Sequence, residues 1–449
     1  MRKISLLTAL LFLLLSFGVG VLAQGVELPA PGLTPDSPFY FLERISEGIG
    51  TFFTFGDLKK AERYAGLASE RVAEAQAVVE KGKPEAAEKA LKRYEDQLGK
   101  ALAKAETAKA KGEKIESVSE IVANATSKHL TVLEGLLEKV PDAAKEAITR
   151  ALEKSKNGHI AALKALAGEN PGKAVGINID SAGGRLEKAK QEAVKKNKAK
   201  VEKDLEDYGD LQTTLEEVRG KGKTLATVVS EERIKDIEDL DKIEDGAKDI
   251  SAGTSAKVKE AKDRTIDREM ASLRDIADED PEKATEINLK AAEARLNRAK
   301  VKADEGKIDE TGEAVEEFEN QYKFGDEISQ IAQGLGKDTT TLEQLVGKAT
   351  SIHLEILAEV YAKVPEQAKE AIEKAMTVSA KGHERAVEAL KAKGALDEVP
   401  EKASMPAKVP GEVQKRIQEK VKEELEREEI KKPEIEKPEI EKPETPKPR

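Results

Sequence analysis

One stretch of 42 residues occurs twice in this chain, and the duplication constrains the fold more than any other feature. Residues 125–166 read ATSKHLTVLEGLLEKVPDAAKEAITRALEKSKNGHIAALKAL, and residues 349–390 read ATSIHLEILAEVYAKVPEQAKEAIEKAMTVSAKGHERAVEAL. His129 and His353 are 224 residues apart, and the other shared landmarks keep this offset without a gap. The sequence therefore predicts a duplicated structural unit.

Each copy has the spacing of two antiparallel helices. From Val118 to Val140, apolar residues alternate at steps of four and three, which is a heptad seam. Pro141 has a fixed φ that suits the first position of a helix, and the residue before a proline leaves the helical region. The step from Val140 to Pro141 thus predicts a tight corner, and a short corner predicts antiparallel packing. A second apolar stripe runs from Ala144 to Leu166.

A weaker third copy lies between the two hairpins. RLEKAK from Arg185 matches RLNRAK from Arg295 at a separation of 110 residues. The same offset places apolar residues on the frame of the first hairpin: Leu240, Leu273 and Ile276. The sequence therefore predicts an all-α protein, an elongated array of tandem helical bundles or antiparallel coiled-coil repeats. Its predicted units are residues 37–168, a degenerate middle unit at 169–279, and residues 280–394.

Composition narrows the function classes. Only 3% of residues are aromatic and Trp is absent, so thin Ala, Leu and Val seams must form the cores. The net charge is −11, and Lys and Glu alternate without a basic block, which argues against nucleic-acid binding. The chain has no Cys, which excludes disulfides, thiolate metal sites and cysteine nucleophiles.

The N-terminus reads as a secretory signal over residues 1–23. Arg2 and Lys3 precede an apolar run from Ile4 to Phe17, and small residues stand before Gln24. We therefore expect a secreted or extracytoplasmic protein, in the periplasm or at the cell surface. The alternative is a retained anchor, since Ile4–Ala23 is about long enough to span a bilayer. No later stretch approaches that length, so no membrane span is expected after signal removal.

The two segments that flank the predicted repeats are rich in proline or charge. Residues 24–36 form a Pro/Gly segment that cannot be helical. Residues 395–449 predict a charged helix from about Pro410 to Glu429 and then a Pro-rich, disordered tail. Such a tail either reaches across a wall or polymer layer or is simply a solvated end.

An aromatic cluster opens the first unit. Ser37 followed by Pro38 predicts a helix N-cap with proline at the first helical position. The helix that follows carries a candidate interaction patch: Phe39, Tyr40, Phe41, Phe52, Phe53 and Phe55. These rings either plug one end of the first bundle or form an exposed docking patch.

The stretches PGLTPDSPFYFLERISEGIGTFFTF at 31–55 and KAERYAGLASERVAEAQAVVEKGK at 60–83, followed by ATSKHL and KVPDAAKEAI, carry a resemblance. The chain resembles a family of secreted bacterial and archaeal helical proteins, catalogued as a domain of unknown function, that opens with Pro-Asp-Ser-Pro-Phe-Tyr-Phe-Leu. The resemblance covers residues 31–167, and the hairpin half recurs at 349–390. It implies an extracytoplasmic helical domain and brings no catalytic residue.

The four histidines are the candidate metal ligands. His129, His159, His353 and His383 all fall on apolar seams, and zinc or copper are the metals they would suit. Along a straight hairpin the two rings of a pair would be offset by roughly 9 Å, so structural histidines are the favoured interpretation. A glycine stands before the second histidine of each pair, and its cost inside a helix predicts close backbone approach or a kink.

No pattern in the sequence identifies an enzyme. The acidic run from Glu231 to Asp249 partly imitates a calcium loop, but Ile243 occupies a ligand position, so a solvated helix face is expected. We predict no catalytic residue and no required cofactor. The expected function is a non-enzymatic structural or interaction protein with a protein or cell-envelope partner. A metal-binding module and a chaperone-like binder are the alternatives.

Overall fold

The computed structural model describes residues 28–220, 222–396, 399–402 and 405–431, and every regular element in these ranges is an α-helix. The predicted signal and the Pro-rich tail from Pro433 onward lie outside the described residues. The chain divides into two compact units. Unit 1 runs to Ala182 and includes Asp210–Arg219, and unit 2 holds Gly183–Gly209 and the chain from Gly220.

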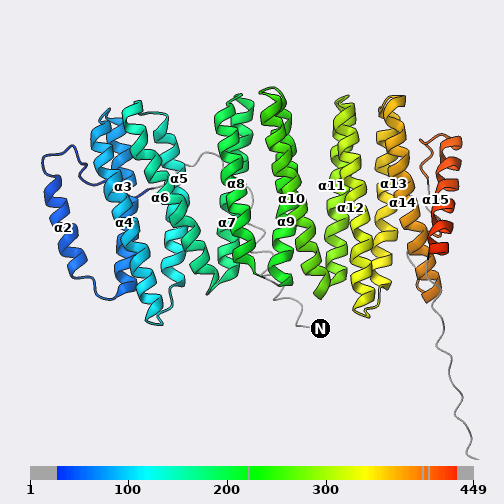
Figure 1. Ribbon diagram of the computed structural model, residues 1–449, viewed down its shortest axis with the longest axis horizontal. Coiled ribbons are helices and arrows are strands. Elements are labelled where there is room, and N and C mark those ends of the chain that lie inside the picture. Colours follow the sequence, from blue (N-terminus) through cyan, green and yellow to red (C-terminus); the bar gives the residue numbers. More distant parts are fainter. Residues whose placement is uncertain (1–27, 221, 397–398, 403–404, 432–449) are drawn as a thin grey trace, which may run out of the picture. The chain divides into compact units, whose positions relative to one another are not determined.

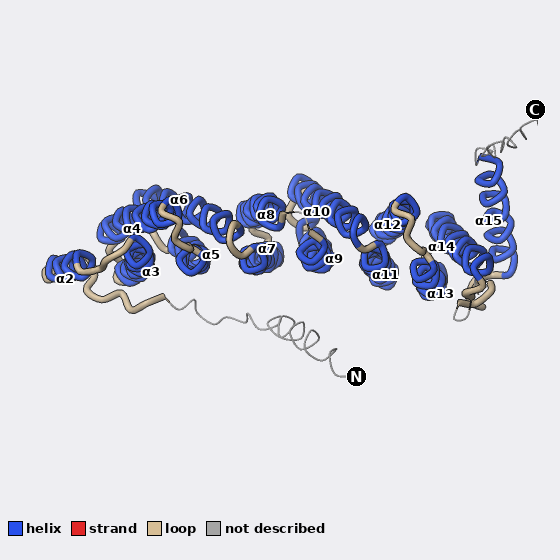
Figure 2. Tube along the Cα trace, turned by 90° about the horizontal axis from the view of Figure 1, so that it is seen from below, coloured by secondary structure: helices blue, strands red, loops and turns tan. Residues whose placement is uncertain are grey.

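Unit 1 is built from antiparallel hairpins in two layers. Helix α3 pairs with α4 and α5 with α6, while α3 also packs on α5 and α4 on α6 (Figures 1 and 2). The first half of α7 and the second half of α8 complete the unit. The helices are α2 (Tyr40–Phe52), α3 (Asp57–Glu80), α4 (Pro84–Ala110), α5 (Glu116–Leu137), α6 (Asp142–Ala167), α7 (Pro171–Val194) and α8 (Lys198–Arg219).

Unit 2 continues the same plan. Its hairpins are α9 with α10, α11 with α12, and α13 with α14. Helices α9, α11 and α13 form one layer and α10, α12 and α14 the other, with α15 against α14 (Figure 2). The helices are α9 (Lys223–Lys248), α10 (Ala252–Glu279), α11 (Pro281–Asp304), α12 (Ile308–Gly334), α13 (Thr340–Lys363), α14 (Glu366–Lys393) and α15 (Gly411–Lys431).

The predicted helix corners are present. Pro141 and Pro365 both have extended ψ angles, 158° and 165°, and each stands directly before the second helix of its hairpin. Proline is therefore the N-cap residue and not the first helical residue. In the middle hairpin, Ser251 caps α10 by accepting a hydrogen bond from the Thr254 amide at 3.1 Å.

The cores are thin seams, as the composition predicts. Leu91, Tyr94 and Leu98 of α4 are fully buried, and alanines between them let the helices approach closely. The frame predicted for the middle hairpin is confirmed, because Leu240, Leu273, and Ile276 with them, have no exposed surface. The ends of the three predicted units coincide with the ends of α6, α10 and α14, and the division into three remains a sequence-based prediction.

We looked for a membrane-spanning helix among the described residues. None of those helices combines the length and the apolar character that crossing a bilayer requires.

Candidate functional site

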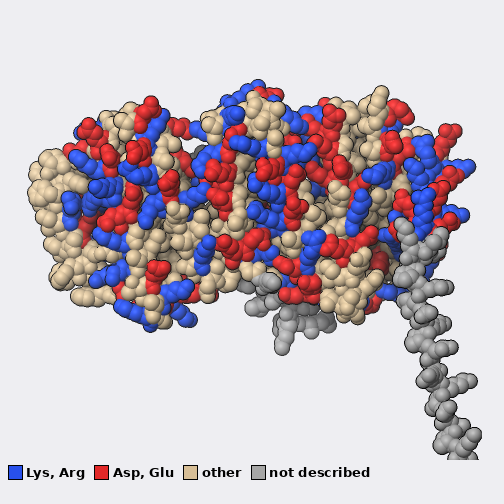
Figure 3. Space-filling view, viewed as in Figure 1, with Lys and Arg blue, Asp and Glu red and all other residues tan. Residues whose placement is uncertain are grey.

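Helix α2 has an unusual orientation: its apolar side faces away from the bundle. None of its 13 residues is buried. Eight large apolar side chains on and beside it are exposed by 50% to 74%, and we call them the α2 apolar face: Phe39, Phe41, Leu42, Ile45, Ile49, Phe52, Phe53 and Phe55. Figure 3 shows this end of unit 1 with few charged side chains on the face in view. The interpretation of the rings as a plug in the bundle is therefore wrong.

Polar side chains hold α2 on the bundle. The fully buried guanidinium of Arg71 donates to the Tyr40 hydroxyl at 3.0 Å and forms an ion pair with Glu47. Arg93 of α4 pairs with Glu47 at 2.8 Å and lies 5.2 Å from the centre of the Tyr40 ring. Tyr40, predicted to share the patch with the phenylalanines, thus faces the opposite way.

A third arginine extends this attachment along the helix. Arg63 of α3 donates to the Thr51 hydroxyl at 2.9 Å and to the Glu47 carbonyl at 3.2 Å. Its guanidinium lies so close to Gly50 that a Cβ atom there would be 2.3 Å from Nη2. We call Arg63, Arg71 and Arg93 the arginine clasp. Because the clasp occupies the polar side of α2, only the apolar side is left to face outward.

Burial shifts the pKa values of the groups under the clasp. Desolvation raises the pKa of Glu74 to about 7, although Arg71 lies 2.9 Å away. Burial also raises the pKa of Tyr40 to about 12, and its hydrogen bond to Glu74, 2.8 Å long, adds to the shift. The tyrosine hydroxyl is therefore a neutral donor across the ordinary pH range, which keeps the clasp intact.

The chain before α2 forms a turn, and the helix begins later than predicted. Tyr40 is the first helical residue, and Ser37 accepts hydrogen bonds from the amides of Phe39 and Tyr40. Lys83 binds the Asp36 carboxylate at 2.8 Å and holds its pKa well below the usual range. This anchor to the α3–α4 turn keeps Ser37 and Pro38 outside the helix.

The second histidine of each hairpin lies in the same environment. His159 Nδ1 is 2.9 Å from the Ala123 carbonyl and 3.2 Å from Thr126 Oγ1. In the other copy His383 Nδ1 makes the equivalent contacts to Gly347 and Thr350, at 3.1 and 3.0 Å. A carbonyl can only accept, so Nδ1 carries the proton in both rings. Each ring thereby ties the two helices of its hairpin together.

The first histidine of each hairpin is packed among aromatic rings. His129 meets Tyr94 edge-on at 5.2 Å, and His353 meets Phe318 in the same way at 5.2 Å. His129 Nε2 also lies 2.9 Å from Ser69 Oγ. Burial lowers the pKa of His129 to about 3 and that of His353 to about 4. Both rings are therefore neutral at pH 7.

These contacts describe structural roles for the four predicted metal ligands. Within the described residues, no group of three or more His, Asp or Glu side chains is arranged to hold a metal ion. In the middle hairpin, Glu269 stands where the first copy has His159. It is fully buried and binds Arg295 at 3.0 Å.

A buried ionic cluster in unit 2 was missed by the sequence analysis. The ammonium group of Lys262 has no exposed surface and lies 2.9–3.1 Å from Asp241, Glu244 and Glu317. The expectation of a solvated acidic face is wrong here, because Asp241 and Glu244 are buried. The signal was the lysine's place on the inner side of α10, where a seam residue belongs. Burial raises the pKa of Asp241 to about 6, and Lys262 and Arg298 oppose this shift.

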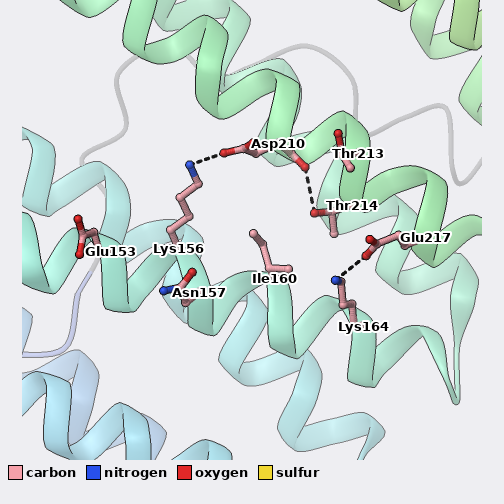
Figure 4. Close-up of a pocket in the computed structure, with 9 residues that line it drawn as sticks. All are labelled: Glu153, Lys156, Asn157, Ile160, Lys164, Asp210, Thr213, Thr214 and Glu217. Carbon is pink, nitrogen blue, oxygen red and sulfur yellow. Dashed lines mark hydrogen bonds and ion pairs between the residues drawn. The ribbon is translucent and has the colours of Figure 1, made fainter.

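A hollow of about 530 Å³ lies between α6 and the second half of α8, within unit 1 (Figure 4). Lys156 pairs with Asp210 and Lys164 with Glu217, each at 2.5 Å. Ile160 lies between these two pairs (Figure 4). Because these four charges are matched with one another, they stabilise the helix contact and do not form an acid–base couple.

Comparisons with known proteins place part of the chain. Residues 32–143 match a family described as a domain of unknown function, DUF5667. The match covers α2 to α5, so the resemblance predicted over residues 31–167 is confirmed for this part. No curated protein matches the chain.

One similar solved structure is described as a circular tandem repeat protein with novel repeat topology and enhanced subunit contact surfaces. Its TM-score is 0.59 at 13% identity, over 86% of this chain and 87% of that one. At this identity the likeness concerns the fold alone, and it confirms the prediction of tandem helical repeats.

Proposed function

We propose that this protein is a non-enzymatic, extracytoplasmic interaction protein whose helical repeats present the α2 apolar face to a partner. One observation carries the proposal: the polar side of α2 is committed to the arginine clasp, and eight large apolar side chains point outward. Exposed patches of this size on otherwise charged surfaces are typical of interaction sites.

The clasp explains how the face stays presented. A short helix with an apolar side would ordinarily turn that side onto the core, since burial of each large side chain is worth about 1.5–3 kcal/mol. Here that turn would strand Arg71, which is fully buried, without Tyr40 and Glu47. Leaving a buried charge without its partner costs about 3–5 kcal/mol. The ion pairs therefore hold α2 in the outward orientation.

The proposed location rests on the N-terminal sequence. Arg2, Lys3 and the apolar run before Gln24 have the layout of a cleaved signal. N-terminal sequencing of the protein isolated from its native cells tests this proposal. A chain starting near Gln24 in the extracytoplasmic fraction is the expected result, and a chain that retains Met1 would contradict cleavage.

In-cell photo-crosslinking tests the interaction function. A photoreactive phenylalanine analogue replaces Phe41 or Phe53 in the full chain, and Val301, an exposed residue of α11, is the matched control. We expect covalent adducts to another protein chain from both α2 positions and none from Val301. Adducts that form equally at Val301, or none at all from α2, would refute the proposed surface.

The five exposed phenylalanines also favour a second function, that of a chaperone-like binder of unfolded chains. Such a binder needs an accessible apolar surface and little sequence specificity. The native protein would then suppress the aggregation of a heat-denatured test enzyme in proportion to its concentration. Ile45→Lys/Ile49→Lys, which places charges in the α2 apolar face, would abolish the effect.

A further inference from the structure

We infer that the partner of the α2 apolar face is the same face of a second copy of this chain, with the two α2 helices antiparallel across a two-fold axis. This inference rests on the proposed function and names the partner. It is carried by the spacing of the exposed residues, by the place of α2 in the fold, by the area of the face and by its charge.

The exposed residues of α2 have the spacing of a helix-pairing seam. Leu42, Ile45, Ile49 and Phe52 follow one another at steps of three, four and three, and all are at least half exposed. This is the a/d pattern through which one helix packs on another. Tyr40 and Glu47 occupy the position opposite the seam, which is the side that the clasp holds. The seam is therefore formed and directed outward before any partner arrives.

The positions beside the seam suit a close antiparallel pair. Ser46 and Gly48 flank its middle, and a Cβ atom at Gly48 would meet nothing within 4 Å. Bulky rings flank both ends: Phe39 and Phe41 before it, and Phe53 and Phe55 after it. Antiparallel pairing about the middle would bring the small residues together. It would also place the N-terminal rings of one copy against the C-terminal rings of the other.

Helix α2 also lacks what the other helices of unit 1 have. Helices α3 and α4, like α5 and α6, are covered by a hairpin partner along their seams. Repeat proteins generally need a terminal element with a polar outer face to remain soluble. The α2 apolar face does the opposite, and a second copy would complete the missing hairpin.

The size of the face matches what a stable dimer needs. Exposed by half to three quarters, each of the eight side chains offers roughly 100 Å², since a fully covered aromatic ring buries about 150–250 Å². The sum, roughly 800 Å² per copy, equals the area that each partner contributes to an interface of standard size.

The charges on α2 favour a protein over a lipid surface. Helices that lie on membranes carry Lys and Arg on their polar side. In α2 the charged residues are two glutamates and one arginine: Glu43, Glu47 and Arg44. The whole chain has a net charge of −11, which disfavours anionic lipid headgroups. A two-fold pair places no charge in the seam, because the a, d, e and g positions from Phe39 to Phe55 are all uncharged.

Sedimentation equilibrium tests this pairing on the chain from Gln24 to Arg449, which contains every described helix. We expect a reversible dimer. Ile45→Lys/Ile49→Lys should raise its dissociation constant on the order of 100-fold, because two charges would enter an apolar seam. Val301→Lys/Ile352→Lys is the matched control, since both residues are exposed aliphatics away from α2, and it should leave the dimer unchanged.

Cysteine crosslinking tests the orientation, and the chain has no Cys of its own to interfere. Antiparallel pairing about the middle of the seam places Ile45 of one copy opposite Ile49 of the other. Under oxidation, a mixture of Ile45→Cys and Ile49→Cys chains should therefore link faster than either chain alone. A Val301→Cys chain should not link.

The remaining outcomes separate this inference from the proposed function. A monomer whose Phe53 photo-adducts contain a different protein would overturn the dimer and leave the interaction function intact. A monomer that floats with phosphatidylcholine vesicles, and loses this in Ile45→Lys/Ile49→Lys, would overturn the dimer in favour of a lipid surface. A dimer that resists the Lys substitutions would show that another surface associates. A monomer without adducts or vesicle binding would overturn both proposals.

Discussion

The hydroxyl oxygen of Tyr322 lies 1.7 Å from the position that a Cβ atom would take at Gly382. In the first copy the equivalent pair is Leu98 and Gly158, where a Cβ atom would be 3.1 Å from Leu98 Cδ2. Both pairs join the second helix of a hairpin to the preceding hairpin. The close backbone approach predicted for these glycines is therefore present in both copies, and it is tighter in the second.

Gly382→Ala should destabilise unit 2. Alanine ordinarily gains about 1 kcal/mol over glycine inside a helix. Here it would displace a buried ring that packs against Phe318 and His353, and overpacking of this kind costs about 1–3 kcal/mol. Denaturant unfolding followed by circular dichroism measures the change. Tyr322→Leu, which reproduces the leucine of the first copy, should rescue the variant.

Two further glycines serve as controls for this substitution. At Gly158 the close atom is the flexible end of a leucine, so Ala should cost less than at Gly382. At Gly135, inside α5, nothing lies within 4 Å of an added Cβ, and Ala should stabilise by up to about 1 kcal/mol. Equal effects at all three glycines would contradict the account of close approach.

Removing the polar contacts of α2 should release the helix while the bundle stays folded. Tyr40→Phe with Glu47→Gln removes the acceptor of Arg71 and the anion shared by Arg71 and Arg93. Hydrogen bonds to charged groups contribute about 1.5–3 kcal/mol each, so amide exchange in α2 should accelerate at least tenfold. Hydrogen exchange with mass spectrometry measures this.

The control for α2 release is Arg150→Gln, which breaks an exposed pair on α6. Exchange in α2 should not respond to this change, and helices α3 and α4 should keep their protection in both variants. Unchanged exchange of α2 in Tyr40→Phe/Glu47→Gln would show that the clasp does not hold it.

The buried, neutral His353 should make the protein less stable in acid. Its pKa is about 4 in the folded chain and 6.5 when unperturbed. As the pH falls from 6.5 towards 4, only the unfolded chain gains this proton, so the free energy of unfolding decreases. The shift corresponds to about 3 kcal/mol at pH 4. His353→Phe, which keeps the ring packing, should lack this loss.

Urea unfolding of both chains between pH 4 and pH 7 measures the difference. Glu74 and Asp236 have folded pKa values of about 7, so they contribute an opposite slope over this range. Both groups are present in the two chains, and the comparison cancels them. Parallel pH profiles would mean that His353 is protonated in the folded protein.

Lys262→Met should strongly destabilise unit 2. The substitution leaves Asp241, Glu244 and Glu317 without the ammonium group that lies among them. Breaking a buried ion pair from one side costs about 3–5 kcal/mol. Thermal unfolding should show a large decrease in the midpoint for this variant.

Lys259→Met provides the comparison for Lys262→Met. Lys259 stands one turn earlier on the same helix and pairs with Glu313 at the surface. Exposed ion pairs contribute about 0–1 kcal/mol, so its midpoint should hardly change. Similar losses for the two lysines would contradict a special role for the buried cluster.

The local pattern of the sequence determined the helices, their corners and the repeat. Apolar spacing and the Pro141 and Pro365 corners depend only on residues a few positions apart, which is why these features could be predicted. The same holds for the seam positions of the four histidines. The 224-residue offset then carried each of these features from the first copy to the second.

Only the tertiary structure decided which side of α2 faces outward and which charges are buried. The heptad spacing of Leu42 and Ile45 is the same whether the seam is covered or exposed. The outcome depends on Arg71 and Arg93, which come from other helices and bind the opposite side. Likewise, Asp241 is buried because Lys262 and Arg298, from neighbouring helices, neutralise it. Partners distant in the sequence leave no periodic signal, so their effects follow from packing alone.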